Sequence, residues 1–156
     1  MSDQTVYLIS GPAGAGKSNI SSALVRSLTK SAYISGDDIS HIPVGGREKP
    51  WLSQETLQLT WENIRSITSN LLKYGFDVVI DYVTFPDPQE EQMGERCLIL
   101  LKEFQACNLP DRYILDNAPY DESAIPEIVE EIRMSPRFRW NDGIDDFVSG
   151  MGRWLR

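Results

Sequence analysis

The sequence is poor in the residues that build disulfide frameworks and structural metal centres. Its 156 residues include 2 cysteines and 1 histidine. Cys97 and Cys107 lack the spacing of metal ligands, and both fall within one segment of helical periodicity. We interpret them as reduced, partly buried side chains that behave as small apolar residues. The two cysteines therefore give no indication of a metal site.

Long apolar runs and an excess of positive charge are also missing. No run approaches the roughly 18 apolar residues that cross a bilayer. The start, MSDQTVYLIS, lacks the basic residues and cleavage site of an export signal. We therefore expect a cytoplasmic location and no membrane partner. The net charge of -8 repels a phosphate backbone, which argues against extended nucleic-acid binding.

The chain length indicates one domain. A length of 156 residues lies near the commonest domain size, and the sequence contains no repeat, low-complexity tract or linker. We predict that residues 1–156 form a single domain, present as a monomer or homodimer.

Short apolar runs alternate with segments of helical periodicity. The runs predict strands at residues 5–10, 32–35, 77–82 and 112–115, and a fifth strand is not visible. Gly75 is predicted to end the second helix. The apolar stripes that predict helices are Ile20, Leu24 and Leu28; Leu57, Trp61, Ile64, Ile67 and Leu71; Met93, Cys97, Leu100, Leu101 and Phe104; and Ile125, Ile128, Val129 and Ile132. This alternation predicts a three-layer α/β fold with a parallel sheet of four to five strands.

The segment GPAGAGKS, residues 11–18, fits the pattern G-x-x-x-x-G-K-[ST] between a predicted strand and a predicted helix. Small residues let successive backbone N–H groups curl around a phosphate, and the helix N-terminus adds its positive dipole end. Lys17 is expected to reach the β- and γ-phosphates, and Ser18 to offer its hydroxyl to Mg²⁺. The alternative is a glycine-rich turn that merely joins strand to helix. The residues expected to contact the nucleotide are Gly11, Pro12, Ala13, Gly14, Ala15, Gly16, Lys17, Ser18 and Asn19.

Carboxylates follow two of the predicted strands. Asp81 ends the third strand, where it is expected to hold Mg²⁺ directly or through a water, or else to serve as a turn or cap residue. Asp77 begins that strand and so belongs to the opposite edge. Asp37 and Asp38 follow the second strand, and one of them could accept the proton of a substrate hydroxyl. The alternative is that one of this pair caps the next turn.

Residues 39–52 are predicted to form a long loop on the expected active edge, and such loops are usually functional. Arg47 could meet a substrate anion and Trp51 could stack on a ring. The alternatives are a solvated charge for Arg47, a core-edge aromatic for Trp51 and an ordinary loop residue for His41.

Three segments, GPAGAGKS, SGDD and VVIDYVTFPDP, together resemble the small P-loop kinases grouped around polynucleotide kinase, chloramphenicol phosphotransferase and zeta toxins. The resemblance covers residues 5 to about 90. It implies a P-loop NTPase fold, ATP and Mg²⁺ as cofactors, and Asp37 as the substrate-contacting carboxylate.

The same resemblance implies a lid near the C-terminus, within residues 118–142, that brings arginines to the phosphates. Arginine suits this role because its planar fork pairs with two phosphate oxygens. Arg133 and Arg137 are the candidates for catalysis, with Arg139 beside them. The alternative is that these arginines pair on the surface with Glu127, Glu130, Glu131 or Asp142.

The function expected from the residues and the resemblance is transfer of the γ-phosphoryl group of ATP to a hydroxyl of a small molecule or nucleotide. One alternative is a non-catalytic or regulatory ATP- or GTP-binding protein, although no lysine follows an asparagine as a guanine signature requires. Another is a zeta-toxin-like kinase of a nucleotide sugar. No motif identifies the phosphoryl acceptor.

Overall fold

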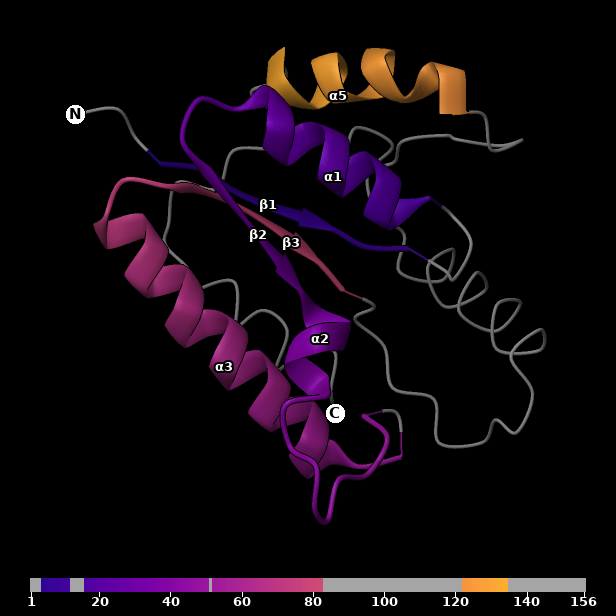
Figure 1. The fold of residues 1–156 in the computed structure, drawn as a ribbon, viewed down its shortest axis with the longest axis vertical. Coiled ribbons are helices and arrows are strands. Elements are labelled where there is room, and N and C mark those ends of the chain that lie inside the picture. Colours follow the sequence, from indigo (N-terminus) through magenta and orange to yellow (C-terminus); the bar gives the residue numbers. More distant parts are fainter. Residues whose placement is uncertain (1–3, 12–15, 51, 83–121, 135–156) are drawn as a thin grey trace, which may run out of the picture.

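The computed structural model describes residues 4–11, 16–50, 52–82 and 122–134 (Figure 1). Within these ranges the fold alternates strands and helices, as the sequence predicts. The elements in chain order are β1 (Val6–Ile9), α1 (Lys17–Ser27), β2 (Ser31–Ser35), α2 (Gly36–Ser40), α3 (Gln54–Lys73), β3 (Asp77–Asp81), the 3-10 turn η2 (Glu122–Ala124) and α5 (Ile125–Met134).

The three described strands form a parallel sheet in the order β1-β3-β2. In the central strand β3, Val78, Val79 and Ile80 are fully buried. Hydrophobic side chains on both faces are typical of a parallel sheet that helices cover on two sides. The predicted α/β class and parallel sheet are therefore confirmed. The predicted strand at 112–115 lies outside the described residues.

The register brings the ends of the strands level with one another. The last residue of β3, Asp81, pairs with Ile9 at the end of β1 and with Ser35 at the end of β2. The segments that follow the three strands therefore leave the sheet at one edge. This edge carries the glycine-rich motif and the aspartates of the candidate site.

Helices pack against both faces of the sheet, with α1 and α5 on one side and α3 on the other (Figure 1). Alternation along β3 divides the core: Val78, Ile80 and Tyr82 face α3, whereas Val79 faces α1 and α5. The α3 side also buries Ile34, Leu57, Trp61 and Ile64, and the α1 side buries Ile20, Leu24, Ile128, Val129 and Ile132.

The predicted stripes on α1, α3 and α5 are confirmed, with two corrections. Leu28 lies just after the end of α1 in an extended conformation, although it still packs against the core. The other correction is on α3. Ile67 is 36% exposed, whereas Thr68 is fully buried. Position 68 lies four residues after the buried Ile64, so it continues the face turned to the sheet and Ile67 falls beside it. Gly75 ends the helix with φ 79°, as predicted. The predicted helix with the stripe from Met93 to Phe104 lies outside the described residues.

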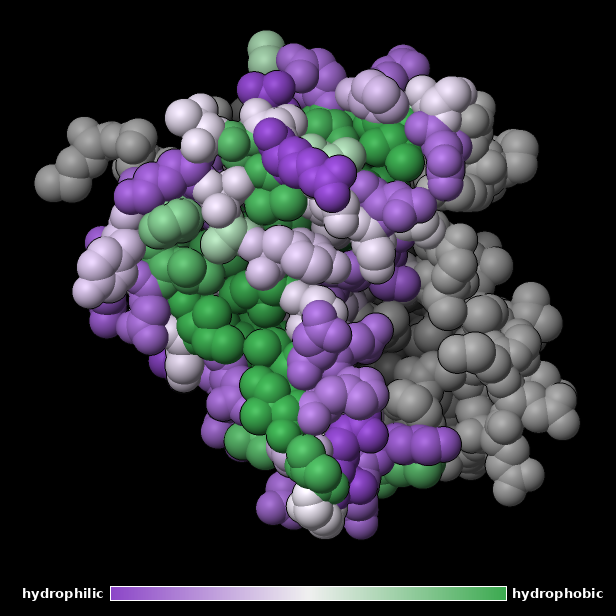
Figure 2. Space-filling view, in the orientation of Figure 1, coloured by the Kyte–Doolittle hydropathy of each residue, from purple (hydrophilic) through white to green (hydrophobic). Residues whose placement is uncertain are grey.

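Apolar side chains gather between α1 and α3 and continue over the segment that follows α2 (Figure 2). Ile42, Val44 and Leu52 in that segment are more than half exposed. Among the helices that the structure describes, none is long and apolar enough to cross a bilayer.

Candidate functional site

The candidate site includes the segment that joins β1 to α1. Gly16 precedes the helix in a left-handed conformation, φ 82° and ψ 15°, and Gly11 after β1 has φ 154°. Both values are favourable only for glycine. The two fixed glycines of the predicted phosphate loop therefore stand where the backbone requires them. Pro12, Ala13, Gly14 and Ala15 lie outside the described residues.

The N-terminus of α1 has a positive electrostatic character. Its first turn contains no acidic residue, and no side chain within the described ranges caps it by a hydrogen bond. The first N–H groups of a helix lack partners inside the helix and carry the positive end of its dipole. Lys17 is the first residue of α1 and Asn19 is exposed in the same turn. An anion is the ligand that this terminus would stabilise.

The two predicted metal ligands meet at this terminus. The hydroxyl of Ser18 donates to Oδ2 of Asp81 at 2.8 Å, although the residues are 63 positions apart. Asp81 alternates with Ile80 along β3 and so faces α1, which carries Ser18 in its first turn. Asp81 is 7% exposed, whereas Ser18 is an exposed residue. The buried carboxylate is thus held from the solvent side by the serine.

A third residue joins this pair. The Tyr33 hydroxyl donates to the same Oδ2 of Asp81 at 3.0 Å. Tyr33 lies opposite Val79 in the register between β2 and β3. It therefore shares a sheet face with Asp81, two residues further along β3. Asp81 is thus a diagonal neighbour of Tyr33, and only a long side chain such as tyrosine spans that separation.

Partial burial, and secondarily the negative charge of Asp81, raises the pKa of Tyr33 to about 12. The phenol therefore keeps its proton at neutral pH and acts as a hydrogen-bond donor. Sequence reasoning missed Tyr33, because its proximity to Asp81 depends on β3 lying between β1 and β2. Alternation within the YIS stretch could have placed Tyr33 on the face opposite Ile34, but not beside a particular carboxylate.

The acidic pair after β2 lies in the short helix α2. The Ser35 hydroxyl accepts from the backbone N–H of Asp38 at 3.2 Å and so caps this helix. The residue that caps α2 is therefore Ser35. The alternative that Asp37 or Asp38 is the cap is wrong. Asp37 and Asp38 are both exposed. Ser35, at the end of β2, pairs with Asp81 at the end of β3. Asp37 and Asp38 therefore lie just beyond the same sheet edge as Ser18 and Asp81, the candidate metal ligands.

Close packing fixes the turn from β2 into α2. A Cβ atom on Gly36 would lie 2.1 Å from Cγ of Tyr82, which is incompatible with the present packing. Tyr82 is buried and its ring lies 5.3 Å from that of Trp61, at an interplanar angle of 57°. The absent side chain at Gly36 lets the ends of β2 and β3 approach each other.

The candidate substrate residue Arg47 contacts the last residue of α2 and the histidine that follows it. Its Nε donates to the carbonyl of Ser40 at 2.9 Å, and a terminal nitrogen lies 3.0 Å from Nε2 of His41. Nδ1 of His41 in turn contacts the carbonyl of Asp37. Arg47 thus holds residues 41–47 against α2. Trp51 lies outside the described residues.

The candidate lid arginine Arg133 forms an exposed ion pair with Glu130, 3.2 Å away on α5. For Arg133, this is the predicted alternative, a surface ion pair with a neighbouring glutamate. Residues 125–134 of the segment predicted to hold a lid form α5, whose apolar face packs on the core beside α1. Arg137 lies outside the described residues.

The donor set fits a divalent ion that arrives with a nucleotide. No three His, Cys, Asp or Glu side chains within the described ranges could hold a metal by themselves. Mg²⁺ differs from most protein-bound metals, because one or two carboxylates usually suffice when phosphate oxygens and waters complete its shell. Ser18 Oγ and the carboxylate of Asp81, already in contact, match that requirement.

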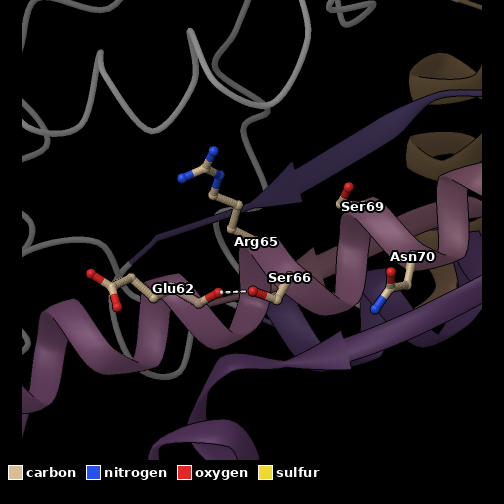
Figure 3. A pocket seen from close by; sticks show the side chains of 5 residues that line it. All are labelled: Glu62, Arg65, Ser66, Ser69 and Asn70. Carbon is tan, nitrogen blue, oxygen red and sulfur yellow. Dashed lines mark hydrogen bonds between the residues drawn. The ribbon is translucent and has the colours of Figure 1, made fainter.

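A separate hollow of about 450 Å³ lies along α3 (Figure 3). The Ser66 hydroxyl in this hollow donates to the carbonyl of Glu62 at 2.9 Å. Because α3 covers the sheet face opposite α1, this hollow is distinct from the site at Asp81. The described residues that line it are Glu62, Arg65, Ser66, Ser69 and Asn70.

No protein-family model matches this chain, and no curated protein is detectably similar to it in sequence.

Proposed function

We propose that this chain is a phosphotransferase with a P-loop NTPase fold, which moves the γ-phosphoryl group of ATP to a hydroxyl of a small molecule or nucleotide. The observation that carries the proposal is the hydrogen bond from Ser18 to Asp81 at 2.8 Å. It joins the end of the glycine-rich motif to the carboxylate at the end of the third strand. A glycine-rich turn that only connected β1 to α1 would have no need of that contact.

Four residues at this edge of the sheet have roles in the proposed reaction: Lys17, Ser18, Asp37 and Asp81. The helix N-terminus and Lys17 bind the phosphates, and Ser18 and Asp81 are the residues that would hold Mg²⁺. When bound, the ion neutralises charge on the β- and γ-phosphates. Asp37 accepts the proton of the acceptor hydroxyl as its oxygen attacks the γ-phosphorus and ADP leaves. Positioning and electrostatics supply most of the acceleration.

The position of Asp37 favours transfer over binding alone. Ser35 caps α2, so the Asp37 carboxylate is exposed at the same sheet edge as Asp81 and is not used as the helix cap. An exposed carboxylate beside a nucleotide site can serve as the base for an incoming alcohol.

One observation favours a second candidate, a nucleotide-binding protein without efficient transfer. Arg133 pairs with Glu130 on the surface of α5. Without an arginine to stabilise charge at the transferring group, a P-loop protein binds ATP but turns it over slowly.

A coupled ADP-release assay with Mg²⁺ and a panel of nucleosides, sugars and amino alcohols tests the first candidate. We expect acceptor-dependent release of ADP that Asp37→Asn lowers at least about hundredfold, as loss of a general base does. Asp38→Asn is the matched neighbour and should retain more activity. A variant Asp37→Asn as active as its parent overturns the role of Asp37.

Calorimetry separates the two candidates from each other. Tight ATP binding with no acceptor-dependent turnover supports the nucleotide-binding protein. Absence of heat with both ATP and GTP in the presence of Mg²⁺ overturns both candidates.

A further inference from the structure

Oδ2 of Asp81 receives two hydrogen bonds from two different elements. Ser18 donates at 2.8 Å from α1, and Tyr33 donates at 3.0 Å from β2. A carboxylate oxygen offers about two lone-pair positions. The two donors therefore occupy Oδ2, and Oδ1 is the oxygen left to meet a further ligand.

The hydrogen bond from Tyr33 restrains the orientation of the Asp81 carboxylate. The terminal torsion of an aspartate is soft, so its carboxylate plane rotates easily when one hydrogen bond alone restrains it. Tyr33 approaches Asp81 across the strand pair, whereas Ser18 approaches from the helix above the sheet. Restraints from two elements hold the plane of the carboxylate better than either one alone.

We propose that Tyr33 is a positioning residue for the metal carboxylate: its hydroxyl holds Oδ2 of Asp81 so that Oδ1 receives Mg²⁺ or one of its bound waters. This inference rests on the proposed function, since it assumes that Asp81 meets the ion. Partners that orient metal ligands in this way typically contribute 10- to 100-fold to metal affinity, as an order of magnitude.

The site of Tyr33 supports a role in orientation. A ligand set is held more accurately by residues on strands and helices than by loops, and all three residues here lie on such elements. Tyr33 is 40% exposed, so its ring is not a core residue retained for packing alone. Its hydroxyl is the part of the side chain that reaches the buried carboxylate.

The test compares ATP binding with and without the metal in the variant Tyr33→Phe, which keeps the ring and the strand. We expect calorimetry in EDTA to give the same ATP affinity as wild type, within about twofold. The gain in ATP affinity on adding Mg²⁺ should fall about tenfold. Tyr74→Phe, a substitution of a 75% exposed tyrosine after α3, is the matched control and should leave both affinities unchanged.

The outcomes separate this inference from the proposed function. Wild-type protein that binds ATP more tightly with Mg²⁺, together with a Tyr33→Phe variant that shows the same gain, overturns the positioning role alone. A Tyr33→Phe variant that loses ATP affinity equally in EDTA and in Mg²⁺ also overturns it, because the effect is then not on the metal. Wild-type protein whose ATP binding does not depend on Mg²⁺ overturns the proposed metal site and the inference with it.

Discussion

The hydroxyl of Ser18 and the carboxylate of Asp81 lie in hydrogen-bond contact across 63 positions of sequence. They belong to different motifs, one in the first turn of α1 and one at the end of β3. The sheet order brings them together, because β3 lies directly beside β1 and faces the same helix. The fold itself therefore brings together the two oxygen-bearing side chains of the proposed Mg²⁺ site.

Replacing Lys17 with alanine should weaken ATP binding at least about tenfold, since a hydrogen bond to a charged partner contributes about 1.5–3 kcal/mol. Isothermal titration calorimetry with Mg²⁺ measures the change. Lys73→Ala at the far end of α3 removes the same charge from the chain and serves as the control. Equal affinities for Lys17→Ala and wild type would remove the phosphate loop from the proposal.

The two aspartates of β3 provide a matched pair. Asp81→Asn should abolish most of the Mg²⁺-dependent gain in ATP affinity, because the neutral amide binds the ion poorly. Asp77 stands at the opposite end of the strand, where it accepts from the Thr5 backbone N–H at 2.7 Å. Asp77→Asn should therefore leave nucleotide binding unchanged. Similar losses in both variants would mean that the substitutions disturb β3 and not a metal site.

Gly36→Ala should lower the free energy of unfolding by about 1–3 kcal/mol, the usual cost of overpacking. The new Cβ atom would meet the buried ring of Tyr82. Urea denaturation measures the loss. Gly45→Ala is the control. Apart from its chain neighbours, no atom of the described residues lies within 4 Å of its added Cβ, so the effect should stay within about 0.5 kcal/mol. A Gly36→Ala variant as stable as Gly45→Ala would show that α2 can shift freely.

The pKa of Tyr33, raised to about 12 by burial and by Asp81, predicts a pH dependence. The ordinary pKa of tyrosine is about 10, so between about pH 10 and 12 the folded chain keeps a proton that the unfolded chain has lost. The unfolded state then binds fewer protons, and stability falls as the pH rises through this window. Wild type should lose more stability there than Tyr33→Phe.

Ultraviolet absorbance of the phenolate provides the direct measurement. The difference between the titrations of wild type and Tyr33→Phe, recorded without metal, isolates the one phenol. A midpoint near 10 in this difference would contradict the hydrogen bond to Asp81.

Local patterns were sufficient to predict most of the described elements. The short apolar run of β3 and the apolar stripe of α3 predicted both elements, because a buried strand and a long amphipathic helix each show their pattern within a few neighbouring residues. The five-residue helix α2 was not predicted, since it is too short for a period to be visible. Ile67 was placed in the stripe because its spacing from Ile64 also fits a helix face, and only the packing decides for Thr68.

The candidate site could be predicted in part for the same reason. Lys17, Ser18 and Asp81 belong to local motifs with a physical rationale, so the sequence alone pointed to them. Tyr33 could not be found in this way, because its partner lies 48 positions further along the chain on a strand whose neighbours were unknown. Likewise, the contact between Gly36 and Tyr82 depends on two strand ends being level.

The pairing of the three strand ends also limits which insertions and deletions the β3 segment can tolerate. Side chains alternate between faces along β3, so an insertion or deletion of one residue between Asp77 and Asp81 would turn Asp81 toward α3. Its carboxylate would then lie on the opposite side of the sheet from Ser18 and Tyr33. Substitutions within β3 can leave these contacts intact, but a single-codon insertion or deletion in this stretch would remove them, and the proposed metal site with them, while most of the hydrophobic composition stayed the same.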